Sequence, residues 1–360
     1  MKRIGILTSG GDCQGLNSTI RAVAKTLYQN YGNDGVQIIG IIDGYRGLIY
    51  NETRMMKPDD FSGILTRGGT ILGTSRQPFK LMRVIDENSV DKVAEMKKNY
   101  KKLELDCLVV LGGNGTQKTA NLLREEGLNV VSLPKTIDND LWGTDKTFGF
   151  QSAVDIATNV IDCIHTTATS HGRVFIVEVM GHKVGWLTLY AGIAGGADVI
   201  LIPEIPYDIN SVINTIKKRT ESGKKFSILA VAEGAISKED AALSKKELKE
   251  KKAKKKYPSV AYELAEKIQE KTDKEVRITV PGHTQRGGSP CAYDRVLATR
   301  LGAEAARAIL EGDFGCMVGT KNQEIIRVPL SEVAGKLKYV DPKASIIKEA
   351  KTIGISFGDE

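Results

Sequence analysis

The amino-acid sequence predicts an α/β protein built on parallel sheets. Short apolar runs, rich in β-branched residues, recur along the 360 residues, and each run ends at a Gly, a Pro or an acidic residue. Helical patterns separate several of these runs, and the 37 glycines suit many tight turns between strands and helices. Such runs are typical of strands that are buried on both faces, and the chain is long enough for two domains.

The expected elements alternate along the chain. Strands are expected at residues 2–7, 36–43, 106–112, 128–133, 173–180, 197–204, 226–234 and 275–283. Helices are expected at residues 17–31, 116–127, 152–168 and 292–312. This alternation predicts parallel sheets with helices on both faces, and in such sheets ligands bind at the carboxyl ends of the strands.

The formal charge of +7 is concentrated in one segment. Residues 245–256, KKELKEKKAKKK, contain eight Lys and two Glu and therefore supply +6. No aromatic or Arg residue interleaves with these lysines, which favours a solvated surface helix or insertion over a nucleic-acid-binding arm. We therefore expect no nucleic-acid partner.

Cysteine usage and hydropathy indicate the cellular setting. The five cysteines are widely spread and form no CxxC pair, which favours neither a disulfide framework nor a zinc site and suits a reducing compartment. The first apolar run is too short for a signal peptide, and no run approaches the length needed to span a membrane. A cytoplasmic protein with no membrane association is expected.

Two of the expected strands end in glycine-rich loops. The loop TSGGDCQGLN contains Gly10 and Gly11, and the loop LGGNGT contains Gly112 to Gly115. The free N–H groups at the start of a following helix bind anions, so either loop can approach a phosphate. A tight strand-to-helix turn is the other interpretation of each loop. The second loop lacks both the Walker A spacing and the third Gly of a dinucleotide-binding fingerprint, although Asp43 at the end of the second expected strand keeps some support for a dinucleotide site.

The segment SLPKTIDNDL places Asp138, Asn139 and Asp140 directly after an apolar strand. One carboxylate in this position can take a proton from a hydroxyl group while the other handles Mg²⁺ or a cationic side chain. An Asx-rich turn that caps a helix explains the same three residues equally well.

Basic side chains near other strand ends favour a phosphorylated ligand. They are Arg76, Arg173, His182, Arg277, His283 and Arg286. An Arg beside a Gly suits bidentate capture of a phosphate, although each Arg alone is also compatible with a surface ion pair. Arg277 lies within an apolar strand, where its charge needs a partner.

Six segments, in this order, resemble the motifs of one family: GGDCQGLN, GGNGT, PKTIDND, GRVFIVEVMG, VAEG and GHTQRGGSP. Over roughly residues 1–310 the chain is similar to the phosphofructokinases of the group that includes the bacterial glycolytic enzyme. The resemblance implies two similar doubly wound, Rossmann-like domains with the active site in the cleft between them. It also implies transfer of a phosphoryl group from ATP, with Mg²⁺, to fructose 6-phosphate.

The same resemblance divides the chain and suggests its assembly. Residues 1–149, with part of about 284–340, form the phosphoryl-donor domain. Residues 150–283, with a C-terminal segment, form the fructose 6-phosphate domain. Arg173 and Arg277 resemble residues that a neighbouring subunit lends, which implies a homodimer or a homotetramer.

The matched positions imply individual roles. Asp138 is implied as the base that takes the proton of the sugar 1-hydroxyl, while Gly11, Arg76 and Thr136 stabilise the transferring phosphoryl group. The implied nucleotide contacts are Gly10, Arg76, Gln77, Gly112, Gly113, Asn114, Gly115 and Thr116. The implied sugar-phosphate contacts are Thr136, Ile137, Asp138, Arg173, Met180, Gly181, His182, Glu233, Arg277, His283, Thr284, Gln285 and Arg286.

The chain departs from the family pattern in three respects. Asn114 stands where an Asp is usual, and because a neutral amide is a weaker Mg²⁺ partner, metal binding is expected to rest less on Asn114 and more on the phosphates and on Asp138 or Asp140. His182 replaces a frequent Arg, which makes that contact sensitive to pH. The lysine-rich run and the length resemble the longer branch of the family.

Two positions bear on the phosphoryl donor, and they disagree. Gly115 matches the ATP users, because a carboxylate at this position would crowd and repel the α-phosphate. Lys135 matches the pyrophosphate users, in which the ammonium of the Lys at this position faces the short diphosphate. We give Gly115 the greater weight, because a flexible Lys can swing aside, and expect ATP; pyrophosphate is the alternative.

Three other functions fit these residues less well. A kinase of the same superfamily that acts on NAD or a lipid would not need the basic residues between Arg277 and Arg286. An NAD-dependent dehydrogenase conflicts with the missing third Gly. A non-catalytic sugar-phosphate sensor would have no use for Asp138.

Overall fold

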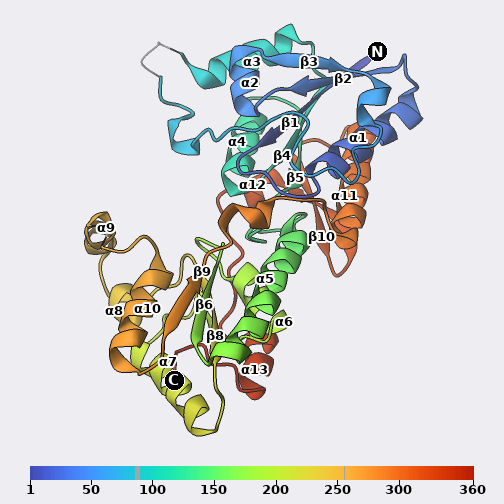
Figure 1. Cartoon of the computed structure of the whole chain (residues 1–360). Helices are drawn as coiled ribbons and strands as arrows, with labels where there is room; N and C mark the ends of the chain where they lie inside the picture. Colours follow the sequence, from blue (N-terminus) through green and yellow to red (C-terminus); the bar gives the residue numbers. More distant parts are fainter. Residues whose placement is uncertain (86–89, 255) are drawn as a thin grey trace. The chain divides into compact units, whose positions relative to one another are not determined.

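The computed structural model describes residues 1–85, 90–254 and 256–360. The chain divides into two compact units, each assembled from two stretches (Figure 1). Unit 1 comprises Met1–Ser152 and Arg286–Lys338, and unit 2 comprises Ala153–Gln285 and Tyr339–Glu360. The chain therefore passes between the units three times, and each unit is described by itself.

Unit 1 contains a seven-stranded sheet with the order β11-β10-β5-β4-β1-β2-β3. Its strands are β1 (Lys2–Ser9), β2 (Val36–Ile41), β3 (Thr53–Met56), β4 (Cys107–Gly112), β5 (Val130–Pro134), β10 (Cys316–Lys321) and β11 (Glu324–Pro329). The central strands are parallel, as predicted, whereas β3 and β11 run antiparallel to their neighbours at the two edges. The strands β3, β10 and β11 were not predicted.

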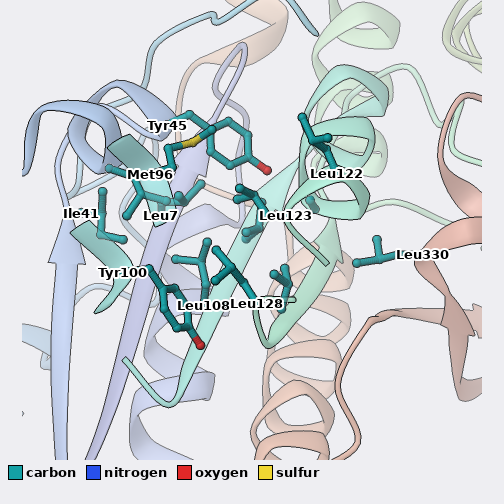
Figure 2. Close-up of a cluster of buried hydrophobic side chains, with 14 of the residues drawn as sticks. Leu7, Ile41, Tyr45, Met96, Tyr100, Leu108, Leu122, Leu123, Leu128 and Leu330 are labelled. Atoms are coloured by element: carbon teal, nitrogen blue, oxygen red, sulfur yellow. The ribbon is translucent and has the colours of Figure 1, made fainter. Parts of the chain in front are cut away.

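Helices cover both faces of this sheet. The helices α1 (Leu16–Tyr31) and α11 (Ala292–Glu311) pack together on one side (Figure 1). The other side carries α2 (Tyr45–Tyr50), α3 (Lys92–Lys102), α4 (Asn114–Glu125) and α12 (Leu330–Val333). The apolar side chains of these helices, such as Leu123 of α4, form one cluster with side chains of the strands, such as Leu7 of β1 and Leu108 of β4 (Figure 2).

Unit 2 contains a four-stranded parallel sheet with the order β7-β8-β6-β9. Its strands are β6 (Val174–Val179), β7 (Val199–Leu201), β8 (Ser227–Ala232) and β9 (Val276–Thr279). Its helices are α5 (Phe150–His171, which starts in unit 1), α6 (Trp186–Ala194), α7 (Ile209–Glu221), α8 (Lys238–Ala241), α9 (Lys245–Ala253), α10 (Val260–Lys271) and α13 (Ser345–Thr352). The predicted α/β class is thus confirmed in both units.

Two expectations change with this topology. The strand β9 was expected to be buried on both faces, but it lies at the sheet edge, and the side chain of Arg277 is 52% exposed. The lysine-rich run forms α9 over Lys245–Ala253, and residue 255 of that run lies outside the described residues. Within residues 1–85, 90–254 and 256–360, no helix is both long and apolar enough to cross a membrane.

Candidate active site

A cavity of about 410 Å³ opens at the carboxyl ends of β1, β4 and β5, which are neighbours in the sheet of unit 1. Its volume is typical of a small-molecule site. Its lining residues are Ser9, Gly10, Gly11, Arg76, Gln77, Pro78, Phe79, Gly113, Asn114, Gly115, Thr116, Lys135, Thr136, Asp138, Asp140 and Arg286. The two glycine-rich loops and the acidic loop therefore meet at one edge of the sheet.

The first glycine-rich loop is tied to the segment that carries Arg76. Gly10 N donates to Ser75 O at 3.0 Å, and Thr74 Oγ1 donates to Gly10 O at 2.7 Å. Gly10 has a φ of 86°, a conformation that L side chains rarely adopt. These contacts bring Arg76 and Gln77 from a loop to the wall of the cavity.

The glycines of the second loop serve two different purposes. A Cβ at Gly112 would lie 2.3 Å from Cγ2 of Thr116, so a side chain is excluded by close packing. A Cβ at Gly115 would meet nothing within 4 Å and would point into open space at the lining of the cavity. Gly112 therefore shapes the loop, whereas Gly115 leaves room for a ligand.

Lys135 is fixed in place. Its side chain is buried, its Nζ donates to Gly11 O, and burial lowers the pKa of its ammonium. Our expectation that Lys135 swings aside from a nucleotide stays a prediction; in this structure its head group is bound to the loop that lines the cavity. The charge stays beside Gly10 and Gly11.

The acidic loop is held by its own hydroxyl groups and by its neighbour Thr147. Asp138 N donates to Thr136 Oγ1 at 3.1 Å, and Thr147 Oγ1 donates to Thr136 O at 2.7 Å. Asn139 Oδ1 accepts from Thr147 N at 3.1 Å. These contacts point the side chain of Asn139 inward while Asp138 and Asp140 line the cavity.

The cavity combines three cations with two carboxylates. Arg76, Lys135 and Arg286 suit a chain of phosphates, and the carboxylates suit a hydroxyl proton or a divalent cation. Among the residues that the structure describes, no group of three or more His, Cys, Asp or Glu side chains forms a complete metal cage. Mg²⁺ is usually held by one or two carboxylates together with substrate phosphates, so the pair Asp138 and Asp140 fits this ion.

Several predicted positions lie outside the cavity or make contacts other than those expected. Gly112 and Ile137 do not line the cavity, and the side chain of Ile137 is fully buried. Arg286, expected with the sugar phosphate, lines this cavity and donates from Nη1 to Asp12 O at 3.0 Å. The amide Nδ2 of Asn114 donates to Lys336 O at 2.7 Å.

Sequence reasoning missed three lining residues: Ser9, Pro78 and Phe79. Ser9 is the last residue of β1, so the rule that ligands lie at carboxyl ends of strands could have found it. Pro78 and Phe79 lie at the start of a short 3-10 helix, Phe79–Leu81, which follows no predicted strand, and nothing in the sequence pattern marks them.

In unit 2, one group of predicted residues lies at the carboxyl end of the sheet. Met180, Gly181 and His182 follow β6, Glu233 follows β8, and His283, Thr284 and Gln285 follow β9. Gln285 is fully buried, and its Oε1 accepts from Met180 N at 3.3 Å. The side chain of His182 is exposed, as is that of Glu233. These three loops thus form a second candidate binding surface.

The other group, Arg173 and Arg277, lies toward the opposite end of the same sheet. Arg173 directly precedes β6, and Arg277 is paired with Phe175 near the start of that strand. At about 3.3 Å per residue, Phe175 is about 13 Å from the carboxyl end of β6. Both guanidinium groups contact one carboxylate, that of Glu275, which supplies the partner expected for Arg277.

Comparison with known proteins supports the assignment made from motifs. The sequence matches the family described as phosphofructokinase over residues 3–309. ATP-dependent 6-phosphofructokinase of Spirochaeta thermophila is 56% identical over 99% of this chain and 98% of that protein. ATP-dependent 6-phosphofructokinase 3 of Bacteroides thetaiotaomicron is 49% identical over 99% of this chain and 100% of that protein.

The fold also matches that of a solved phosphofructokinase structure. Phosphofructokinase of Pichia pastoris in the T-state superposes with a TM-score of 0.78 and 35% identity, over 92% of this chain and 37% of that longer one. The fold and the cavity define an α/β protein of the doubly wound class, with glycine-rich loops around a cationic pocket. The chain belongs to the phosphofructokinase family, which confirms the resemblance seen in its motifs.

Proposed function

We infer that this protein transfers the γ-phosphoryl group of ATP to the 1-hydroxyl of fructose 6-phosphate, a step of glycolysis. The observation that carries the inference is the cavity of unit 1, where two glycine-rich loops, three cationic side chains and Asp138 converge. The family and the names of its nearly full-length relatives support the same reaction.

In the proposed mechanism, Asp138 accepts the proton of the 1-hydroxyl as its oxygen attacks phosphorus. The N–H group of Gly11, with Arg76 and Thr136, stabilises the negative charge on the transferring group, and the buried Lys135 adds a fixed positive charge beside them. Mg²⁺, held by Asp138 or Asp140 together with the phosphates, would neutralise charge on the phosphate chain.

ATP is the proposed donor because the space at Gly115 is open. A Cβ there meets no atom within 4 Å, so a nucleotide can extend past this position. The position of Lys135 does not argue against ATP, because its ammonium is bound to the backbone carbonyl of Gly11. The ATP-dependent names of the relatives support this choice over pyrophosphate.

The sugar phosphate is proposed to bind the loops that follow β6, β8 and β9, through Met180, His182, Glu233 and His283. Arg173 and Arg277 are proposed to complete such a site in a neighbouring subunit, because they lie toward the other end of the sheet. A homodimer or a homotetramer follows from this proposal. The enzyme is separately proposed to act in the cytoplasm.

A coupled assay tests the proposed function. Formation of fructose 1,6-bisphosphate from fructose 6-phosphate is followed with Mg²⁺ and either ATP or pyrophosphate, and omission of Mg²⁺ is expected to abolish turnover. Turnover with ATP and not with pyrophosphate is expected. Turnover with pyrophosphate alone would assign the donor choice to Lys135, and no turnover with either donor would refute the proposal.

A further inference from the structure

A segment near the end of unit 1 lies along the acidic loop. Leu337 forms an antiparallel bridge with Leu141, and Lys338 N donates to Asp140 O at 2.9 Å. Lys338 is the last residue of unit 1 before the chain enters unit 2. The acidic loop is therefore braced by a segment about 200 residues further along the chain.

The side chain of Lys338 makes three hydrogen bonds to this loop. Its Nζ donates to Asn139 Oδ1 at 3.1 Å, to Thr144 O at 2.9 Å and to Asp145 O at 2.7 Å. An ammonium group has three donors, and all three have acceptors here. Burial, with Lys146 nearby, lowers the pKa of Lys338 to about 8.

These hydrogen bonds connect two parts of the acidic loop, Asn139 and the pair Thr144 and Asp145. Asn139 is the residue after Asp138 and adopts a left-handed φ of 51°, which is uncommon for a side-chain-bearing residue. Its Oδ1 receives hydrogen bonds from Lys338 Nζ and Thr147 N. Thr144 and Asp145 lie at the far end of the loop, so one ammonium joins the two ends.

A short path connects this ammonium to Asp138. Thr147, which shares Asn139 Oδ1 with Lys338, also donates from Oγ1 to Thr136 O at 2.7 Å. The Oγ1 of Thr136 in turn accepts from Asp138 N at 3.1 Å. The backbone on both sides of Asp138 is thereby held by groups that depend on one another.

We propose that Lys338 is a positioning residue, whose ammonium holds the acidic loop in the shape that aims Asp138 into the cavity. This rests on the proposed function, since Asp138 is the base of that reaction. The side chain of Lys338 donates to Asn139 Oδ1 and to the backbone carbonyls of Thr144 and Asp145, and it acts by fixing the backbone of the loop. Loss of the ammonium lowers kcat more than it changes either KM, because the bound substrates remain while the base is misaligned.

The test replaces and then restores the ammonium. The Lys338→Cys variant is assayed for kcat and for the KM of ATP and fructose 6-phosphate, before and after alkylation with 2-bromoethylamine. Alkylation rebuilds a side chain with the length and charge of Lys. We expect kcat to fall by about 10–100-fold, both KM values to change little, and alkylation to recover most of the loss.

The matched control is Lys321→Cys, at the exposed end of β10 in the same unit. It is alkylated in parallel and is expected to keep wild-type kinetics. The wild-type protein, also alkylated, reports any effect on the native cysteines. If the wild type turns over and Lys338→Cys keeps its kcat, or if alkylation of the folded variant recovers nothing, the positioning role is refuted.

A second variant covers the case in which Lys338→Cys fails to fold. Lys338→Gln keeps a donor near the loop but lacks the charge and the third hydrogen bond. A fall in kcat with unchanged thermal unfolding supports the proposal, and a wild-type kcat overturns it. Absence of turnover in the wild type itself refutes the proposed reaction and is distinguished from either result.

Discussion

The two units present their candidate ligand-binding residues in different ways. In unit 1 the residues follow three adjacent parallel strands, so one cavity collects the glycine-rich loops, the acidic loop and three cations. In unit 2 the candidates divide between the two ends of one sheet. A parallel sheet gathers the residues that follow its strands and separates them from residues that precede those strands.

The cations of the two units also differ in how they are held. Lys135 is buried, lines the cavity and is bound to a backbone carbonyl. Arg173 and Arg277 are partly exposed and share the carboxylate of Glu275. A fixed charge is suited to the reacting phosphates, whereas an exposed pair is available to a ligand that displaces a carboxylate.

The largest expected effect is that of Asp138→Asn. The amide cannot accept the hydroxyl proton, so kcat should fall by about 10²–10⁴-fold with little change in the KM for ATP. Steady-state kinetics measure this, with thermal unfolding as the check that the fold is intact. A kcat close to that of the wild type would remove Asp138 from the role of base.

The substitution Gly115→Asp is expected to have the next largest effect on the kinetics. A carboxylate projecting into the open space should repel the phosphates of ATP and raise its KM by about 10–100-fold. The control is Gly115→Ala, whose Cβ meets nothing within 4 Å and which should retain ATP turnover. Unchanged ATP kinetics in Gly115→Asp would show that this position does not select the donor.

Arg277→Met tests whether the divided residues of unit 2 act in one site. Loss of a bidentate phosphate contact should raise the KM for fructose 6-phosphate by about 10–100-fold. A mixture of Arg277→Met and Asp138→Asn subunits, unfolded and refolded together, should recover activity at low fructose 6-phosphate that neither variant shows alone at that concentration. No recovery in verified hybrids would place Arg277 and Asp138 in the site of one subunit.

A smaller effect is expected at Glu275. A phosphate that binds Arg173 and Arg277 must displace this carboxylate, and exposed ion pairs contribute up to about 1 kcal/mol. Glu275→Gln should therefore lower the KM for fructose 6-phosphate by up to about five-fold. The control is Glu263→Gln, which removes an ion pair with Lys267 on α10 and should leave the KM unchanged. A raised KM would mean that Glu275 orients the two arginines.

A last prediction, outside the catalytic kinetics, concerns thiol reactivity in the two units. Cys13 in unit 1 is fully buried, and burial raises its pKa to about 12, so roughly one molecule in three thousand carries the thiolate at pH 8.5. Cys163 in unit 2 is exposed. Iodoacetamide at pH 8.5 should modify Cys163 well before Cys13, as measured by peptide mass spectrometry. Equal rates would contradict the closed packing behind the first glycine-rich loop.

The sequence alone was sufficient for the α/β class, for the parallel strands other than β10 and for the three loops of the cavity. Buried parallel strands are nearly continuous apolar runs, and the polar residues after them must lie at one edge of the sheet. The edge strands β3 and β11 were missed because β3 has four residues and β11 is only partly buried, so neither is a continuous buried apolar run. The strand β9 is also an edge strand, so the expectation that it is buried on both faces failed at Arg277.

Only the tertiary structure decided where long-range contacts fall. The attachment of Lys135 to Gly11, the return of Arg286 to the cavity and the bracing of the acidic loop by Lys338 join residues more than a hundred positions apart. No local pattern encodes such pairs, because each depends on the chain path that the packing of both sheet faces selects. The sequence identifies the residue types that do the chemistry, while the fold sets their orientation.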